Sequence, residues 1–162
     1  MGRISPDMLV MDAVIPRTRL CEVVAKIDRL SAEYGLTVAN VFHAGDGNLH
    51  PLILFDGRHP DQVEKIFALG EAVMKICVEA GGSLSGEHGI GFEKKEYMSM
   101  VFSEADLDTM KRVKAVFNPD GLLNPDKIFP TRRACSEIGK QRTTSTADIE
   151  KRVEAILKGS AN

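Results

Sequence analysis

Two histidines flank a glycine-rich turn in the stretch FHAGDGNLH, which covers residues 42–50. They are His43 and His50, and the pair Asp46-Gly47 lies between them. An Asp-Gly pair between apolar runs is a strong signal for a β-hairpin with a two-residue turn. In that register His43 faces His50, with Cβ atoms roughly 4.5–5.5 Å apart. Two imidazoles at this separation can bind one metal ion, although a longer loop would change the register.

A second stretch, SLSGEHGIG at residues 83–91, places an acidic and an imidazole side chain among glycines. Glu87 can supply an oxygen ligand, and two histidines with one carboxylate leave coordination positions open, as in catalytic metal sites. His88 is suited to act as a general base near neutral pH. Gly86 and Gly89 allow the backbone to approach a ligand closely.

Each stretch also has a purely structural interpretation. A histidine near a turn is commonly a hydrogen-bonding surface residue, and the EHG sequence could be a helix cap with solvated charges. The remaining histidine, His59, precedes a proline at a predicted helix start and is interpreted as a surface residue. What favours a shared site is that the other three histidines fall in only two glycine-rich stretches.

Composition indicates one soluble domain of 162 residues with a net charge of −2. Basic residues are scattered, without a basic stripe or an aromatic platform, so nucleic-acid binding is not expected. No apolar run approaches the ~20 residues that span a bilayer, and the N-terminus has no apolar signal segment. Cys21 and Cys77 lie in apolar helical patterns and are predicted to be reduced core residues, which suits a cytoplasmic location.

Hydrophobic periodicity predicts the elements that must position these side chains. Strands are expected at residues 8–15, 36–42, 49–55 and 83–85, and helices from Thr18 to Gly35 and from Pro60 to Gly81. The order β-α-β-β-α-β predicts an α+β fold, a ferredoxin-like antiparallel sheet with helices on one face. Pro51 suggests that its strand lies at an edge or contains an irregularity.

The part of the chain after the second glycine-rich stretch is expected to add C-terminal helices. Helical patterns cover residues 94–102 and 105–117, and the turn-rich run NPDGLLNPDKIFP follows them. We expect one domain at residues 1–135 and a polar tail at residues 136–162 with a short helix at IEKRVEAIL.

Taken together, FHAGDGNLHPLILF, SGEHGIG, FNPDGLLNPDKIFP and the opening RISPDMLVMDAVIPR resemble the C-terminal domain of FAD-linked oxidases of the vanillyl-alcohol-oxidase type. Within that family the chain is most similar to the flavoprotein subunit of bacterial glycolate oxidase, which is related to D-lactate and D-2-hydroxyglutarate dehydrogenases. The resemblance covers roughly residues 3–135.

The resemblance implies oxidation of a small 2-hydroxy acid, glycolate or D-lactate, to the 2-oxo acid, with FAD as hydride acceptor. It implies that His43, His50 and Glu87 bind a divalent metal such as zinc, and that His88 takes the substrate's hydroxyl proton. Asn48, Gly86 and Gly89 would then lie near substrate or cofactor. The implied partners are an FAD-binding domain and other glycolate oxidase subunits, including an iron–sulfur subunit. Those subunits could also attach the protein peripherally to the inner membrane, which is the alternative to a purely cytoplasmic location.

No glycine-rich pyrophosphate loop precedes a βαβ unit in this sequence. We therefore expect a C-terminal fragment that lacks the N-terminal FAD-binding domain and is inactive by itself. The main alternative is a stand-alone metal-binding or interaction module without catalytic activity, which could form a homodimer through an exposed apolar face. A metal-dependent hydrolase using the same three ligands is a third hypothesis.

Overall fold

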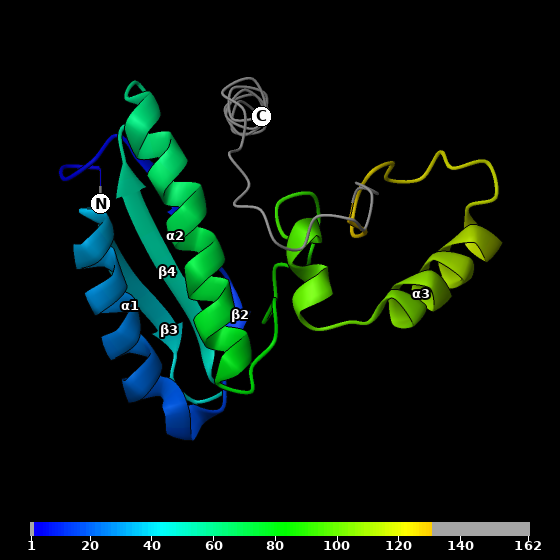
Figure 1. The fold of residues 1–162 in the computed structure, drawn as a ribbon, viewed down its shortest axis with the longest axis horizontal. Helices are drawn as coiled ribbons and strands as arrows, with labels where there is room; N and C mark the ends of the chain where they lie inside the picture. Colours follow the sequence, from blue (N-terminus) through cyan, green and yellow to red (C-terminus); the bar gives the residue numbers. More distant parts are fainter. Residues whose placement is uncertain (1, 131–162) are drawn as a thin grey trace.

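The computed structural model describes residues 2–130. These residues form an antiparallel sheet with two long helices on one face, followed by a lobe that contains two shorter helices (Figure 1). The strands are β1 (Asp7–Val10), β2 (Ala13–Val14), β3 (Thr37–His43) and β4 (Asn48–Phe55). The helices are η1 (Arg17–Arg19), α1 (Leu20–Tyr34), α2 (Pro60–Glu79), η2 (Lys95–Met100) and α3 (Glu104–Phe117).

Strand β4 is the centre of the sheet, with β3 along one side and β1 and β2 along the other. The register of β1, with Val10 opposite Leu52, continues unchanged into β2, where Ala13 lies opposite Leu49. The Met11 N–H also donates to the Pro51 carbonyl at 2.9 Å. The predicted strand at residues 8–15 is therefore confirmed as one line of pairing, with a break at residues 11–12.

The fourth predicted strand, at residues 83–85, is reduced to one bridge between Ser83 and Val14. Two residues after this bridge, the Ser85 hydroxyl donates to the Asp12 carboxylate. Across the sheet the order is the Ser83 bridge, then the line formed by β1 and β2, then β4, then β3. This is the strand order of a ferredoxin-like fold. The predicted α+β class is confirmed.

Pro51 lies in the central strand, so the edge position suggested by the sequence is wrong. In an antiparallel ladder the N–H and C=O of one residue point to the same neighbour. The Pro51 carbonyl bonds Met11, so the ring nitrogen also faces the break between β1 and β2. The position without an N–H thus faces the break in the neighbouring strand line. This agrees with the other interpretation of Pro51, that it marks an irregularity in the strand pairing.

One face of the sheet packs against α1 and α2 to form the core. Leu49 and Ile53 of β4 are fully buried against apolar residues of both helices, among them Val23, Ile27 and Ile66. Gly35 ends α1 in the left-handed conformation, with a φ of 65°, as its position after the helical pattern predicted.

The prediction that both helical cysteines are core residues is only half right. Cys77 on α2 is buried, and burial raises the pKa of its thiol to about 12. Cys21 on α1 is exposed. It precedes the buried Val23 by two positions, which corresponds to roughly 200° around a helix, so it points away from the core.

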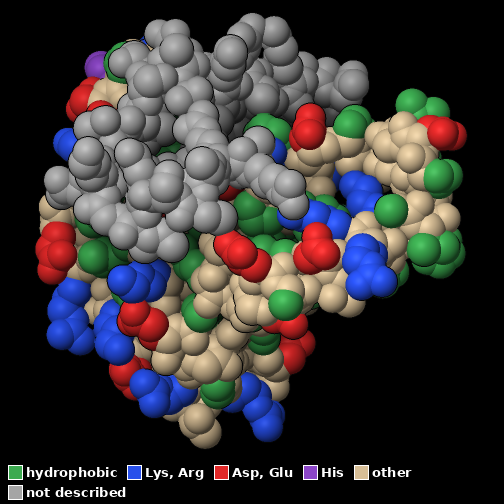
Figure 2. Space-filling model, turned by 45° about the vertical axis from the view of Figure 1, so that its right-hand side comes forward, with side chains coloured by type: hydrophobic (Ala, Val, Ile, Leu, Met, Phe, Trp, Pro, Cys, Tyr) green, Lys and Arg blue, Asp and Glu red, His purple; other side chains and the backbone are tan. Residues whose placement is uncertain are grey.

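The lobe after the sheet begins with the short helix η2 and continues into α3. Ser103 starts α3 with a capping box, since its hydroxyl accepts from the Asp106 N–H while the Asp106 carboxylate accepts from the Ser103 N–H. Apolar side chains lie on the surface of this lobe, at the right of Figure 2, and Val116 and Phe117 are among the most exposed. The predicted tail helix lies outside the described residues.

Within residues 2–130, no helix combines the length and the apolar character needed to cross a membrane.

Candidate metal centre

The hairpin between β3 and β4 has a different register from the one predicted. His43 lies opposite Asn48 and Val41 opposite His50, so the loop contains four residues rather than two. The Asp46 and Gly47 N–H groups both donate to the His43 carbonyl, which closes a wider turn. The shift is by two residues, and side chains alternate with period two. Both histidines therefore share one face, with ring centroids 5.5 Å apart.

Gly47 is a position in this turn that does not accommodate a side chain. Its φ is +80°, and a Cβ atom at this position would lie 2.1 Å from the carbonyl oxygen of Ile15. The Gly47 carbonyl accepts from the Ile15 N–H at 3.0 Å, and Arg17 donates to the Gly45 carbonyl at 3.1 Å. These contacts hold the tip of the hairpin against the segment that follows β2.

Asp12 is the residue that sequence reasoning missed. It lies at the break between β1 and β2, and since Val10 pairs with Leu52 and Val14 with Asn48, it faces His50 on the open side of the sheet. It is fully buried. A single aspartate in an apolar strand does not by itself predict a functional role. The sequence showed only that a charged residue interrupts a run of residues that must be buried.

The Asp12 carboxylate organises the second glycine-rich stretch. It accepts from the N–H groups of Gly86 and His88 at 3.1 Å, from the Ser85 hydroxyl at 2.6 Å and from the Lys94 ammonium at 2.8 Å. Burial opposes the charged form, but the Lys94, Ser85 and His88 hydrogen bonds outweigh it and hold the pKa of Asp12 well below its usual range.

This arrangement brings the three predicted metal ligands together. The Glu87 Oε1 atom lies 3.1 Å from His50 Nε2 and 3.9 Å from His43 Nε2. Donors on a tetrahedral zinc ion at about 2.0–2.2 Å lie roughly 3.3–3.6 Å from one another. The observed separations bracket that range, so the donor set fits a small divalent cation with a position left for a further ligand.

A second group of potential ligands, Asp12, His50 and His88, also lies within 4.8 Å. The oxygens of Asp12 are already occupied by Lys94, Ser85 and backbone donors, so this carboxylate is not free to bind an ion. The His50 Nδ1 atom faces this carboxylate at 3.8 Å, which is beyond hydrogen-bond distance, and it has no hydrogen-bond partner within residues 2–130.

The predicted general base, His88, lies beside the ligands. Its Nε2 atom is 3.9 Å from Glu87 Oε1, and its ring stacks on His50 at 5.1 Å with an interplanar angle of 19°. The His50 side chain is 8% exposed, whereas those of His43, Glu87 and His88 are 59%, 53% and 47% exposed. The site is therefore anchored on one buried imidazole and is accessible to solvent on its other side.

The three remaining predicted residues differ in how they contact the site. Asn48 is buried beside the ligands, and a Cβ atom at Gly86 would lie 2.3 Å from its Oδ1 atom, so this glycine permits close packing. The Asn48 Oδ1 atom has no hydrogen-bond partner in the described part of the chain. Gly89 has open space around it and a φ of +82°, and its N–H donates to Ser85.

The fourth histidine, His59, lies outside this cluster. His59 is exposed at the N-terminal end of α2, and the carboxylate of Asp56 lies 3.8 Å away. The prediction that His59 is a surface residue is confirmed.

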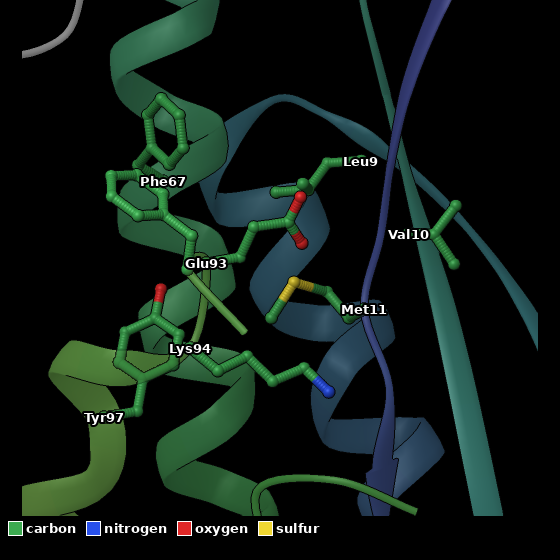
Figure 3. Close-up of a pocket in the computed structure, with 8 residues that line it drawn as sticks. Leu9, Val10, Met11, Phe67, Glu93, Lys94 and Tyr97 are labelled. Atoms are coloured by element: carbon green, nitrogen blue, oxygen red, sulfur yellow. The ribbon is translucent and has the colours of Figure 1, made fainter. Parts of the chain in front are cut away.

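A cavity of about 50 Å³ lies between β1, α2 and the segment that precedes η2 (Figure 3). Leu9, Met11, Phe67 and Tyr97 contribute to its lining, and none of the ligand residues does.

Comparison with known proteins gives a consistent result. The profile of the family described as FAD linked oxidases, C-terminal domain, matches residues 1–128. The chain is 54% identical to the glycolate oxidase subunit GlcD of Escherichia coli over 138 residues, which are 85% of this chain and 28% of that protein. It is 36% identical to GlcD of Bacillus subtilis over 129 residues, which are 80% of this chain and 27% of that protein. It is 35% identical to mitochondrial D-lactate dehydrogenase [cytochrome] 1 of Saccharomyces cerevisiae over 127 residues, which are 78% of this chain and 21% of that protein. The chain spans about a quarter of the length of these relatives.

Proposed function

This chain belongs to the family of FAD linked oxidase C-terminal domains, and from that membership we propose that it supplies the metal and substrate side of the active site of an FAD-dependent 2-hydroxy acid dehydrogenase. The substrate class is proposed from the names of the relatives, which are glycolate oxidase subunits and D-lactate dehydrogenases. Glycolate and D-lactate share a carboxylate next to a hydroxyl-bearing carbon.

The observation that carries the proposal is the convergence of His43, His50 and Glu87. Three segments distant in sequence contribute, because the hairpin brings the two imidazoles onto one face and Asp12 brings the Glu87 backbone beside them. Two neutral imidazoles and one carboxylate form a ligand set typical of catalytic zinc and of related divalent ions. The metal itself is part of the proposal.

When bound, the metal would supply Lewis acidity at the substrate's oxygens, and the flavin would supply the two-electron acceptor. This chain's own residues would do the rest. His43, His50 and Glu87 hold the cation, and His88 accepts the hydroxyl proton at Nε2, which lies beside the ligands on the accessible side of the site. The buried Asn48 keeps the hairpin and Gly86 in contact.

The flavin would come from an FAD-binding domain that covers the open face of the sheet. This face carries the metal ligands at one end and the exposed apolar side chains of Met8, Val10 and Val41 beside them. Burying these side chains would exclude water from the reacting atoms, which strengthens electrostatic interactions in the site. An iron–sulfur subunit and a homodimer remain predictions.

The metal content of the purified chain tests this proposal. We expect about one equivalent of zinc after dialysis against zinc and removal of excess, measured by plasma mass spectrometry. The His43→Ala His50→Ala double variant should lose it. His59→Ala is the matched control, because this histidine is exposed at the start of α2 and should leave the metal content unchanged.

Absence of metal from both the parent chain and the double variant at millimolar zinc would contradict a preformed metal centre. Retention of metal by the double variant would show that another set of residues binds it. Turnover of glycolate with a dye by this chain alone would contradict the proposed division of labour with an FAD-binding domain.

A further inference from the structure

We propose that Asp12, held by Lys94, is a positioning residue that fixes Glu87 and His88 against the hairpin that carries His43 and His50. The inference concerns residues that would contact neither substrate nor flavin, and its consequence for metal binding rests on the proposed function. The Asp12 carboxylate has no exposed surface, and all of its hydrogen bonds named below are to groups of the same protein.

Three consecutive backbone N–H groups converge on this carboxylate. They belong to Gly86, Glu87 and His88, at 3.1, 3.3 and 3.1 Å from the nearest Asp12 oxygen. Successive N–H groups that point to one centre form a concave anion-binding arrangement. Here the anion is a side chain of the same protein, so the backbone of both functional residues is tied to the strand line that pairs with β4.

Lys94 closes the arrangement from the other end of the loop. Its ammonium donates to the Asp12 carboxylate at 2.8 Å and to the Asp12 carbonyl at 2.6 Å, and the lysine is buried. The side chain extends toward the strand from the segment that precedes η2 (Figure 3). A buried carboxylate left without its cation would be strongly destabilising, so the two residues act as one unit.

The side chains of Glu87 and His88 need such an anchor because both are about half exposed. The Glu87 Oε1 atom lies 3.1 to 3.9 Å from the imidazoles of His50, His43 and His88, so these ion-pair contacts stay inside the cluster. Exposed side chains on a loop reach a defined position only if the backbone beneath them is held. Asp12 supplies this restraint and also faces the Nδ1 atom of His50 at 3.8 Å.

The sharpest variant replaces the pair by apolar residues, as Asp12→Leu Lys94→Met. Exchanging a buried ion pair for apolar side chains of similar size is often neutral for stability. The three amides would lose their acceptor, so we expect them to exchange with D₂O at least about tenfold faster in NMR spectra of the full 162-residue chain. Asp12→Asn, which keeps one acceptor oxygen, is the second variant and should give a smaller effect of the same sign.

Asp7→Asn is the matched control. Asp7 lies at the start of β1 and also accepts from a backbone N–H, that of Gly57 at 2.8 Å. It is at the opposite end of the strand line from the site. Its substitution should leave exchange at Gly86, Glu87 and His88 unchanged, which separates a local restraint from a general loosening of the fold.

Binding of Co²⁺ supplies the readout that a merely structural role would not move. Near-ultraviolet circular dichroism shows which variants remain folded. In those variants the Co²⁺ affinity should fall roughly 10–100-fold, and the visible absorption bands of bound Co²⁺ should change. If the double variant does not fold, Asp12→Asn decides. Unchanged exchange and unchanged Co²⁺ binding in a folded Asp12 variant would overturn the inference. A parent chain that binds no Co²⁺ would count against the metal centre, while the exchange experiment would still decide whether Asp12 holds the loop.

Discussion

At the scale of single residues, the centre combines one fixed imidazole with three accessible groups. His50 is buried between Asp12 on one side and Glu87 on the other. Its low exposure and its stacking on the His88 ring restrict the orientation of the His50 imidazole. His43 and His88 adjoin this fixed ring. The order of the site therefore depends on Asp12 more than on any of the exposed residues.

Acid sensitivity should follow from Asp12. Its pKa in the folded state lies below the ordinary value, so its interactions stabilise the fold above pH ~4 and are progressively lost as the pH falls toward the folded-state pKa. The free energy of unfolding of the parent chain should exceed that of Asp12→Asn at pH 7, and the difference should shrink at pH 3. Urea unfolding at both pH values measures it.

Asp61→Asn is the control for this comparison, since the Asp61 side chain is exposed at the start of α2. Its effect should stay within about 0.5 kcal/mol at both pH values. A difference between the parent and Asp12→Asn that is the same at pH 7 and pH 3 would show that the Asp12 carboxylate does not contribute through its charge.

At the scale of elements, the hairpin presents both imidazoles because its tip docks on the segment after β2. The four-residue loop is closed by two N–H groups on the His43 carbonyl, and Gly47 then adopts a positive φ against Ile15. A two-residue turn would place different residues opposite each other but would leave both histidines on the same face. The shared face is thus robust to the register, whereas the separation of the rings depends on it.

Gly47→Ala should therefore be costly. The left-handed conformation and the close approach of the new Cβ to the Ile15 carbonyl should lower the free energy of unfolding by about 2 kcal/mol or more. Gly45→Ala lies in the same loop, where a Cβ would meet nothing within 4 Å, and should change stability by no more than about 0.5 kcal/mol. Urea denaturation of both variants gives the comparison, and equal effects would contradict the assigned turn.

At the scale of the whole molecule, the two faces of the sheet have different roles. One face is covered by α1 and α2 and contains the core. The other carries the candidate centre together with exposed apolar side chains such as Met8 and Val10. The E. coli and S. cerevisiae relatives are roughly three to four times as long as this chain, and their further residues include segments available to cover this face. The exposed apolar residues of α3 form a second surface, remote from the sheet.

A whole-enzyme measurement tests the role of His88. We expect a protein in which this chain is joined to the FAD-binding part of a glycolate oxidase subunit to reduce a dye with glycolate or D-lactate. His88→Gln should lower kcat about 10²–10⁴-fold, because the hydroxyl proton loses its acceptor. His59→Gln, at the start of α2, should leave kcat unchanged, and an equal loss in both variants would remove His88 from the reaction.

Local chemistry in the sequence determined most elements of this protein. Helical periodicity placed α1 and α2, Gly35 marked the end of the first helix, and runs of apolar, β-prone residues placed the strands. These signals depend on neighbours within one or two turns, so they are legible without the fold. The two glycine-rich stretches also drew attention to the histidines and to Glu87 before any distance was known.

Tertiary structure alone decided the register of the hairpin, the central place of Pro51 and the role of Asp12. Each depends on a partner far away in sequence: Gly47 on Ile15, Pro51 on Met11, and Asp12 on Lys94. A buried charge is tolerated only where the fold brings its cation and hydrogen-bond donors together. The sequence therefore indicated which residue types could bind a metal, and the packing of the sheet decided how a buried carboxylate brings them to one place.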